Sequence, residues 1–119
     1  MEKGKYLIDK SVWKTTGKSR RKARVLEERE GYIDMENNLA YSLNEFGDCK
    51  VTDLNTGLSV YSCYGKSIED CIEKYGKTIV EAINKARSQY YYDDCLKLFE
   101  YLKTCTEPIT EQKLARMFA

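Results

Sequence analysis

The apolar residues change their spacing once along the chain, from every second position to every third or fourth. Between residues 39 and 64 apolar and polar positions alternate, and the turn-forming stretches NEFGD (44–48) and NTG (55–57) interrupt the alternation. From residue 68 the spacing becomes helical, in a stripe formed by Ile68, Ile72, Tyr75, Ile79, Ile83 and Ala86. Strands followed by helices predict an α+β fold with a small antiparallel β-sheet of about three to four strands, covered on one face by C-terminal helices.

The predicted strands form a meander in the middle of the chain. Residues 39–43, 49–54 and 58–64 alternate, and residues 32–35 join them as a further strand. In the last strand we expect Leu58, Val60 and Ser62 on one face, with Ser59, Tyr61 and Cys63 on the other. The segment KYLI (5–8) is an additional short strand candidate.

Capping signals define the predicted helices. Ser67, with Asp70 three residues later, marks an N-terminus, and Gly76 leaves open whether one kinked helix or two helices follow. Asp93 or Asp94 begins another helix, with Cys95, either Leu98 or Phe99, and Leu102 facing inward. That helix ends before Pro108, because the residue preceding proline is pushed out of the helical region.

Length and composition indicate one globular domain. The 119 residues are predicted to form a single α+β domain, 1–119, with a basic N-terminal segment (1–30), a β-meander (31–64) and a helical part (66–119). Because no run of 18 apolar residues and no secretion-signal core is present, we expect a cytoplasmic protein without membrane contact. The sequence does not predict the oligomeric state.

The sequence lacks the residues that several kinds of catalytic site require. The chain has no histidine, which removes Ser-His-Asp and Cys-His sites, and it has no phosphate-binding G-x-x-x-x-G-K-[ST] loop. The five cysteines are an odd number and no two are spaced as in a zinc knuckle, so we expect reduced, buried thiols and no metal. We therefore predict a protein that is not an enzyme and has no cofactor.

The positive charge is concentrated in one stretch. Residues 10–26 contain seven Lys or Arg residues and no acid, although the whole chain has a net charge of only +1. The stretch either attracts a polyanion or an acidic protein surface, or is a solvated face paired with Glu27, Glu28 and Glu30. We expect a loop at 15–19, and slightly favour a helix at 19–30 over the strand that its alternation also allows.

Three consecutive tyrosines, Tyr90 to Tyr92, lie between two predicted helices, where at least one must be exposed. Tyrosine is enriched in binding surfaces because it offers a large, stiff contact area. The predicted partner-binding residues are therefore the basic and aromatic ones: Lys14, Lys18, Arg20, Arg21, Lys22, Arg24, Tyr90, Tyr91 and Tyr92.

The C-terminal segment LFEYLKTCTEPITEQKLARMFA (98–119) resembles the first two helices of a winged-helix domain, including the short strand-like PIT between them. In that family the next helix reads the bases, and no such helix follows Ala119 in this sequence. We therefore expect residues 110–118 to form a packing helix, with Leu114 and Phe118 in the core or against a partner.

A second resemblance covers residues 17–87. The basic GKSRRKAR (17–24), the predicted strands of VTDLNTGLSVYS (51–62) and the capped helices are together similar to small anti-CRISPR proteins of mobile elements. The resemblance implies a non-catalytic inhibitor that occupies a surface of a nuclease complex, with a protein or ribonucleoprotein as partner. Many such inhibitors are acidic mimics of DNA, and this chain departs from them. The alternative is an accessory protein that binds nucleic acid directly through the basic segment.

Overall fold

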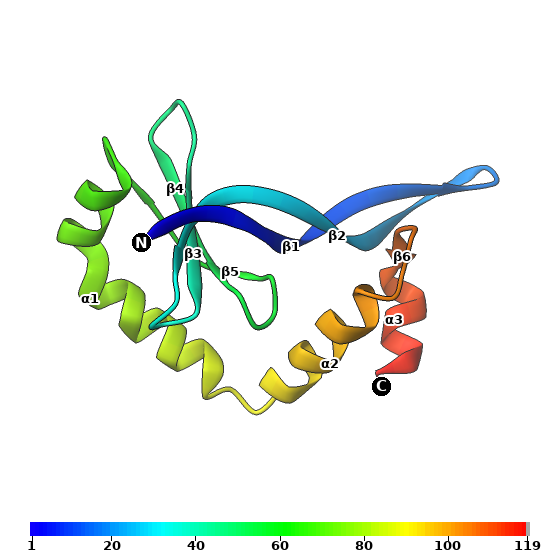
Figure 1. Ribbon diagram of the computed structural model, residues 1–119. Coiled ribbons are helices and arrows are strands. Elements are labelled where there is room, and N and C mark those ends of the chain that lie inside the picture. The colour runs from blue at the N-terminus through cyan, green and yellow to red at the C-terminus, as the bar shows by residue number, and fades with distance from the viewer. Residues whose placement is uncertain (119) are drawn as a thin grey trace.

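Two strands of unusual length form the start of the chain. Strand β1 (Glu2–Thr16) has 15 residues and β2 (Ser19–Asp34) has 16, whereas most strands have five or six. The computed structural model describes residues 1–118, and in it these two strands form one twisted hairpin that extends well beyond the rest of the molecule (Figure 1). The hairpin gives the molecule its elongated shape, with principal extents of 47 × 32 × 20 Å.

Three shorter strands continue the sheet. Strands β3 (Leu39–Leu43), β4 (Asp48–Asp53) and β5 (Ser59–Tyr64) follow β2 in the antiparallel order β1-β2-β3-β4-β5. The sixth strand, β6 (Ile109–Thr110), pairs with the outer part of β2. The α+β class is thus confirmed, but the predicted three to four strands were too few, because the basic segment joins the sheet.

The expected helix over residues 19–30 is wrong, since these residues lie in β2. They pair with β1 in an unbroken register that runs from Glu2 opposite Ile33 to Thr16 opposite Ser19. The arginine, lysine, alanine and glutamate residues there favour a helix locally, but the long-range pairing outweighs that preference. The expected loop at 15–19 shrinks to Gly17 and Lys18, and Gly17 has the positive φ of 60° that a tight two-residue hairpin turn requires.

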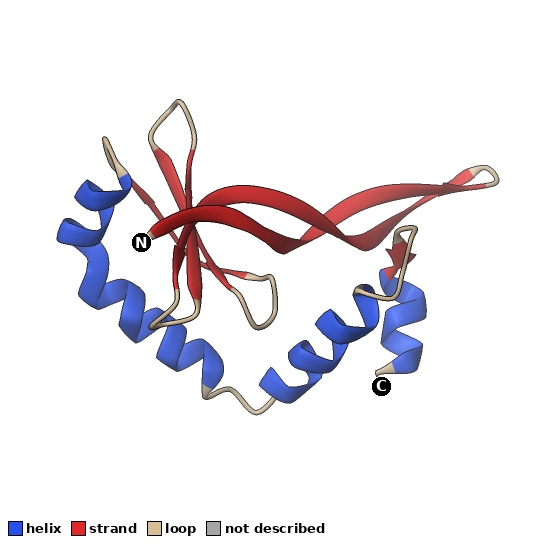
Figure 2. Ribbon diagram, in the orientation of Figure 1, coloured by secondary structure: helices blue, strands red, loops and turns tan. Residues whose placement is uncertain are grey.

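Helix α1 (Ile68–Arg87) covers the sheet at the other end of the molecule, where the principal core lies (Figure 2). The predicted apolar stripe is confirmed: Ile68, Ile79 and Ile83 are buried against β3, β4 and β5. The helix continues through Gly76 without interruption. The predicted cap is present too, because Ser67 Oγ accepts a hydrogen bond from the Asp70 amide.

The end of β5 alternates as predicted, and the face that carries Cys63 is the buried one. Cys63 is buried and Ser62 is exposed, so the buried face at the end of β5 carries Cys63 instead of Ser62. A register shift between Val51 and Thr52 of β4 interrupts the simple alternation between β4 and β5. The expected alternation of Tyr61, Ser62 and Cys63 is therefore present, and the irregularity lies at Val60, which has no partner in the register.

The C-terminal elements pack beside the outer hairpin. Helix α2 (Tyr92–Leu102) buries Phe99, one of the two alternatives, and Leu102, whereas Cys95 is only partly buried. Helix α3 (Glu111–Met117) buries Leu114. The Tyr101 and Phe118 rings contact each other edge to face, with 6.2 Å between their centroids. The packing helix predicted for residues 110–118 is confirmed, with Thr110 as its cap. In the described chain, none of the helices has the length and apolarity needed to cross a bilayer.

Candidate functional site

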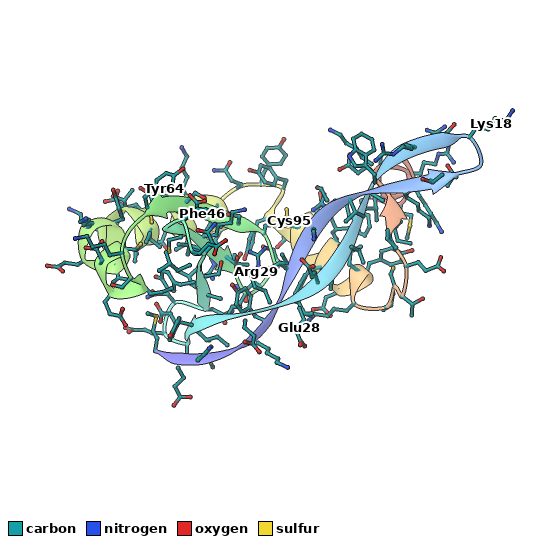
Figure 3. The ribbon with its side chains drawn as sticks, turned by 90° about the horizontal axis from the view of Figure 1, so that it is seen from above. Lys18, Glu28, Arg29, Phe46, Tyr64 and Cys95 are labelled. Carbon is teal, nitrogen blue, oxygen red and sulfur yellow. The ribbon has the colours of Figure 1, made fainter. Side chains whose placement is uncertain are left out.

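The basic stretch forms the outer part of the hairpin. We call residues 10–24 the basic arm; its two strands belong to β1 and β2, and Lys18 lies at its far end (Figure 3). Alternation along each strand divides the arm into two faces, and residues opposite one another share a face. The two faces have different surroundings, and this difference decides which cations are free to bind.

One face of the arm carries an exposed aromatic ring among cations. Trp13 is 58% exposed, and Lys22 lies directly opposite it in the register. The Arg20 guanidinium stands 5.2 Å from the centroid of the Trp13 ring, a cation–π distance. Glu111 of α3 lines the shallow depression next to Trp13 and Lys22. The face therefore offers a flat apolar ring with two positive groups beside it.

The sequence prediction omitted Trp13. It is the only tryptophan of the chain and it lies inside the basic stretch. An aromatic residue interleaved with cations is a typical signal of a nucleic-acid-binding surface, and it was available in the sequence.

The opposite face is held by the C-terminal elements. The Lys14 ammonium donates to the Pro108 carbonyl at 2.8 Å, and the Arg21 guanidinium donates to the Gln112 side chain, also at 2.8 Å. Ala23 is fully buried where β2 pairs with Thr110 of β6. Lys14 and Arg21 therefore help to hold the arm in place, whereas Lys18, Arg20 and Lys22 make no side-chain hydrogen bond or ion pair among the described residues.

Arg24 is a structural residue of the arm. Its guanidinium donates to both carboxylate oxygens of Asp9 on β1, and the Asp9 side chain is almost fully buried. The hydrogen bond to Asp9 raises the pKa of Arg24 above its usual value, against the lowering effect of burial. Its interpretation as a partner-binding residue is thereby weakened, because a side chain held by a buried carboxylate is not free to bind another anion.

The acids that follow the arm neutralise only its inner end, at Lys10. Glu27 pairs with Lys10 at 3.2 Å and Glu28 pairs with Lys5 at 3.5 Å, both across the hairpin. Arg24 and Glu28 do not pair with each other, because residues four apart on a strand are about 13 Å apart along it. The charges at the tip of the arm remain solvated.

The three tyrosines lie away from the arm, and Tyr92 is oriented differently from the other two. They lie at the junction of α1 and α2, which Figure 1 places far from the arm tip. Tyr90 is 95% exposed and its ring meets the half-exposed Tyr91 ring edge to face, at 5.4 Å between centroids. Tyr92 is turned inward, where its hydroxyl donates to Asp53 at 2.5 Å. Tyr90 and Tyr91 remain available for a partner, and Tyr92 is structural.

Three cysteines meet in the principal core, although their separation along the chain had argued against a cluster. The sulfur atoms of Cys49, Cys63 and Cys71 lie within 4.8 Å of one another, and all three residues are buried. Burial raises the pKa of the Cys49 and Cys63 thiols. Cys95 and Cys105 lie outside this cluster and are partly exposed.

Comparison with known proteins gives no relative. No protein-family model, curated protein or solved structure matches this chain.

Proposed function

We propose that this protein is a non-catalytic nucleic-acid-binding protein whose basic arm is the contacting element. The observation that supports it most is the exposed face with Trp13 between Arg20 and Lys22, on a two-stranded ribbon that extends from the body of the molecule. Cations bind phosphates without regard to sequence, and an aromatic ring stacks on a base. The arm places both kinds of group on one face.

The dimensions of the arm suit a nucleic-acid groove. The major groove of B-DNA is about 12 Å wide and admits a two-stranded β-ribbon, whose strands are about 4.8 Å apart. From Trp13 opposite Lys22 to Thr16 opposite Ser19, the end of the arm spans four residues on each strand, roughly 13 Å at about 3.3 Å per residue. The C-terminal elements contact this end on one face only, through Lys14 and Arg21, so Lys18 and Arg20 are left to reach phosphates.

The inhibitor of a nuclease complex, predicted from the anti-CRISPR resemblance, stays a prediction. It would use the same arm, with Tyr90 and Tyr91 as a second contact at a distance from it. We place direct nucleic-acid binding first because the arm combines solvated cations with a stacking ring, which is the chemistry of a nucleic-acid ligand.

Tryptophan fluorescence tests the proposal directly, since Trp13 is the only tryptophan. We expect titration with a short DNA duplex or single strand to quench the emission and to reach saturation, because the indole ring leaves water and stacks or packs in a groove. A gel-shift assay in parallel reports binding independently of the arm.

Two results would contradict the proposal. Absence of any complex with either strand form at low salt would exclude a nucleic-acid ligand. A complex that leaves the emission unchanged would place the contact elsewhere on the surface. Binding to an intact nuclease ribonucleoprotein, without binding to free nucleic acid, would favour the inhibitor instead.

A further inference from the structure

Three thiols from three separate elements converge beneath the start of α1. Cys49 on β4 lies opposite Cys63 on β5, and Cys71 reaches them from the first turns of α1. Their sulfur atoms all lie within 4.8 Å of one another. Cys49 and Cys71 are completely buried, and Cys63 is 8% exposed, which leaves Cys63 as the side closest to solvent.

The spacing of the sulfurs suits a common metal ion. A Zn–S bond of about 2.3 Å places the sulfurs of a tetrahedral site roughly 3.8 Å apart, so the three atoms need to close by at most about 1 Å. Gly65 borders the cluster, and a Cβ atom there would lie 2.4 Å from the Cys71 sulfur. Residue 65 therefore has to be glycine if the Cys71 sulfur is to keep this position.

The core around the cluster is apolar, with Leu39, Val51 and Ile79 among its members, so a charged metal site there has to be nearly neutral. Three thiolates and one divalent cation carry a single net negative charge. The partial positive charge at the N-terminus of α1, near Cys71, reduces the cost of burying that charge.

We propose that Cys49, Cys63 and Cys71 form a binding site for a thiophilic divalent metal ion of the Zn(II) class, held by three thiolates. Among residues 1–118 the group of ligand atoms contains only these three sulfurs, so a water molecule or another small ligand completes the tetrahedron. Binding replaces three thiol protons, which pass to the buffer, and involves no change of oxidation state. This site is separate from the basic arm, so either proposal can fail without the other.

The test uses the full chain, reduced and treated with chelator, and then titrated with Zn(II) or with Co(II) as a spectroscopic probe. We expect one ion per chain, and thiolate-to-cobalt charge-transfer and tetrahedral d–d bands in the Co(II) protein. Cys49→Ala, Cys63→Ala and Cys71→Ala should each weaken binding by more than about 100-fold, since changes even beyond the direct ligands typically cost 10–100-fold. The matched controls Cys95→Ala and Cys105→Ala should bind as the parent does.

If a variant fails to fold, a measurement on the unaltered protein can still contradict the proposal. X-ray absorption at the zinc edge should count three sulfur neighbours and one oxygen or nitrogen neighbour. A shell with fewer than three sulfurs would overturn the site. So would the failure to bind one equivalent of Zn(II), or equal losses in the variants of Cys95 and Cys105.

Discussion

Asp53 is the residue that joins the sheet to both long helices. Its carboxylate is 1% exposed and accepts hydrogen bonds from Arg87 at the end of α1, at 2.9 Å, and from Tyr92 at the start of α2, at 2.5 Å. The Asn55 amide and the Thr56 hydroxyl occupy its remaining positions. A buried carboxylate with four donors thus links the end of α1 and the start of α2 to the end of β4.

Removing this carboxylate should strongly destabilise the protein. We expect Asp53→Ala to lower the free energy of unfolding by about 3 kcal/mol or more, because Arg87 loses its ion-pair partner in a partly buried position. The control Glu81→Ala removes an exposed carboxylate on α1 and should change it by less than about 0.5 kcal/mol. Urea unfolding monitored by circular dichroism measures both. Equal stabilities of the two variants would show that Asp53 does not hold the elements together.

Tyr41 makes stability depend on pH in the alkaline range. Burial raises its pKa from 10.0 to about 12, so the folded protein keeps a proton that the unfolded chain releases. The contribution is fully present below about pH 10 and is lost as the pH rises towards about 12. A shift of this size corresponds to at most about 2.7 kcal/mol.

Replacement of Tyr41 by Phe should remove this part of the alkaline loss. We expect the free energy of unfolding of Tyr41→Phe to fall less steeply between pH 10 and 12 than that of the parent, because no phenolic proton is then released at this position. Tyr90→Phe, at an exposed site, should follow the parent. Parallel curves for all three proteins in chemical unfolding at several pH values would contradict the assignment.

At the scale of elements, α1 covers the principal core, and Ile79, near the middle of this helix, is completely buried. We expect Ile79→Ala to lower the free energy of unfolding by about 2–4 kcal/mol, through lost burial and the cavity that remains. Lys77→Ala, two residues away on the exposed side, should stay within about 0.5 kcal/mol of the parent. Denaturant melts compare them, and a loss below about 1 kcal/mol for Ile79→Ala would mean that α1 does not close the core.

The sequence predicted α1 well because its signals are local. The Ser67 cap and the spacing of the isoleucines both act within one helix, and each was readable in a short window. Strand β2 is the opposite case. The stretch from Ser19 to Glu30 contains good helix formers, and its strand state depends on partners in β1 as far away as Lys5 opposite Glu30. No local window contains that pairing.

The candidate sites also divide into features that are local in the sequence and features that depend on distant residues. The positive charge of the arm was visible in the sequence. Which lysine is hydrogen-bonded was not, because Lys14 donates to Pro108, which lies far along the chain, whereas Lys18 stays solvated. The three-cysteine cluster was not foreseen, because Cys49, Cys63 and Cys71 meet only after a hairpin and a helix have folded over one another. Spacing rules for zinc knuckles detect only sites built within short segments.

At the scale of the whole molecule, the fold has a packed core at one end and an arm supported by the C-terminal elements at the other. Helix α1 covers β3, β4 and β5, whereas α2, β6 and α3 lie along the outer hairpin (Figure 1). An isolated two-stranded hairpin is at best marginally stable in water. The pairing of β6 with Ala23 and Arg24 therefore gives the arm the support that it needs to present its exposed face.

The salt dependence of nucleic-acid affinity tests the central claim most directly. The variant Lys18→Ala, Arg20→Ala, Lys22→Ala removes three solvated charges of the arm, and Lys66→Ala, Lys77→Ala, Lys97→Ala removes three exposed charges elsewhere. Each lost phosphate contact should reduce the slope of log affinity against log salt by about 0.9, so the arm variant should lose up to roughly 2.7 with duplex DNA. Its melting temperature should stay close to that of the parent, because exposed charges contribute little to stability. The control should keep the parent's slope, and equal slopes for arm variant and control would contradict the account.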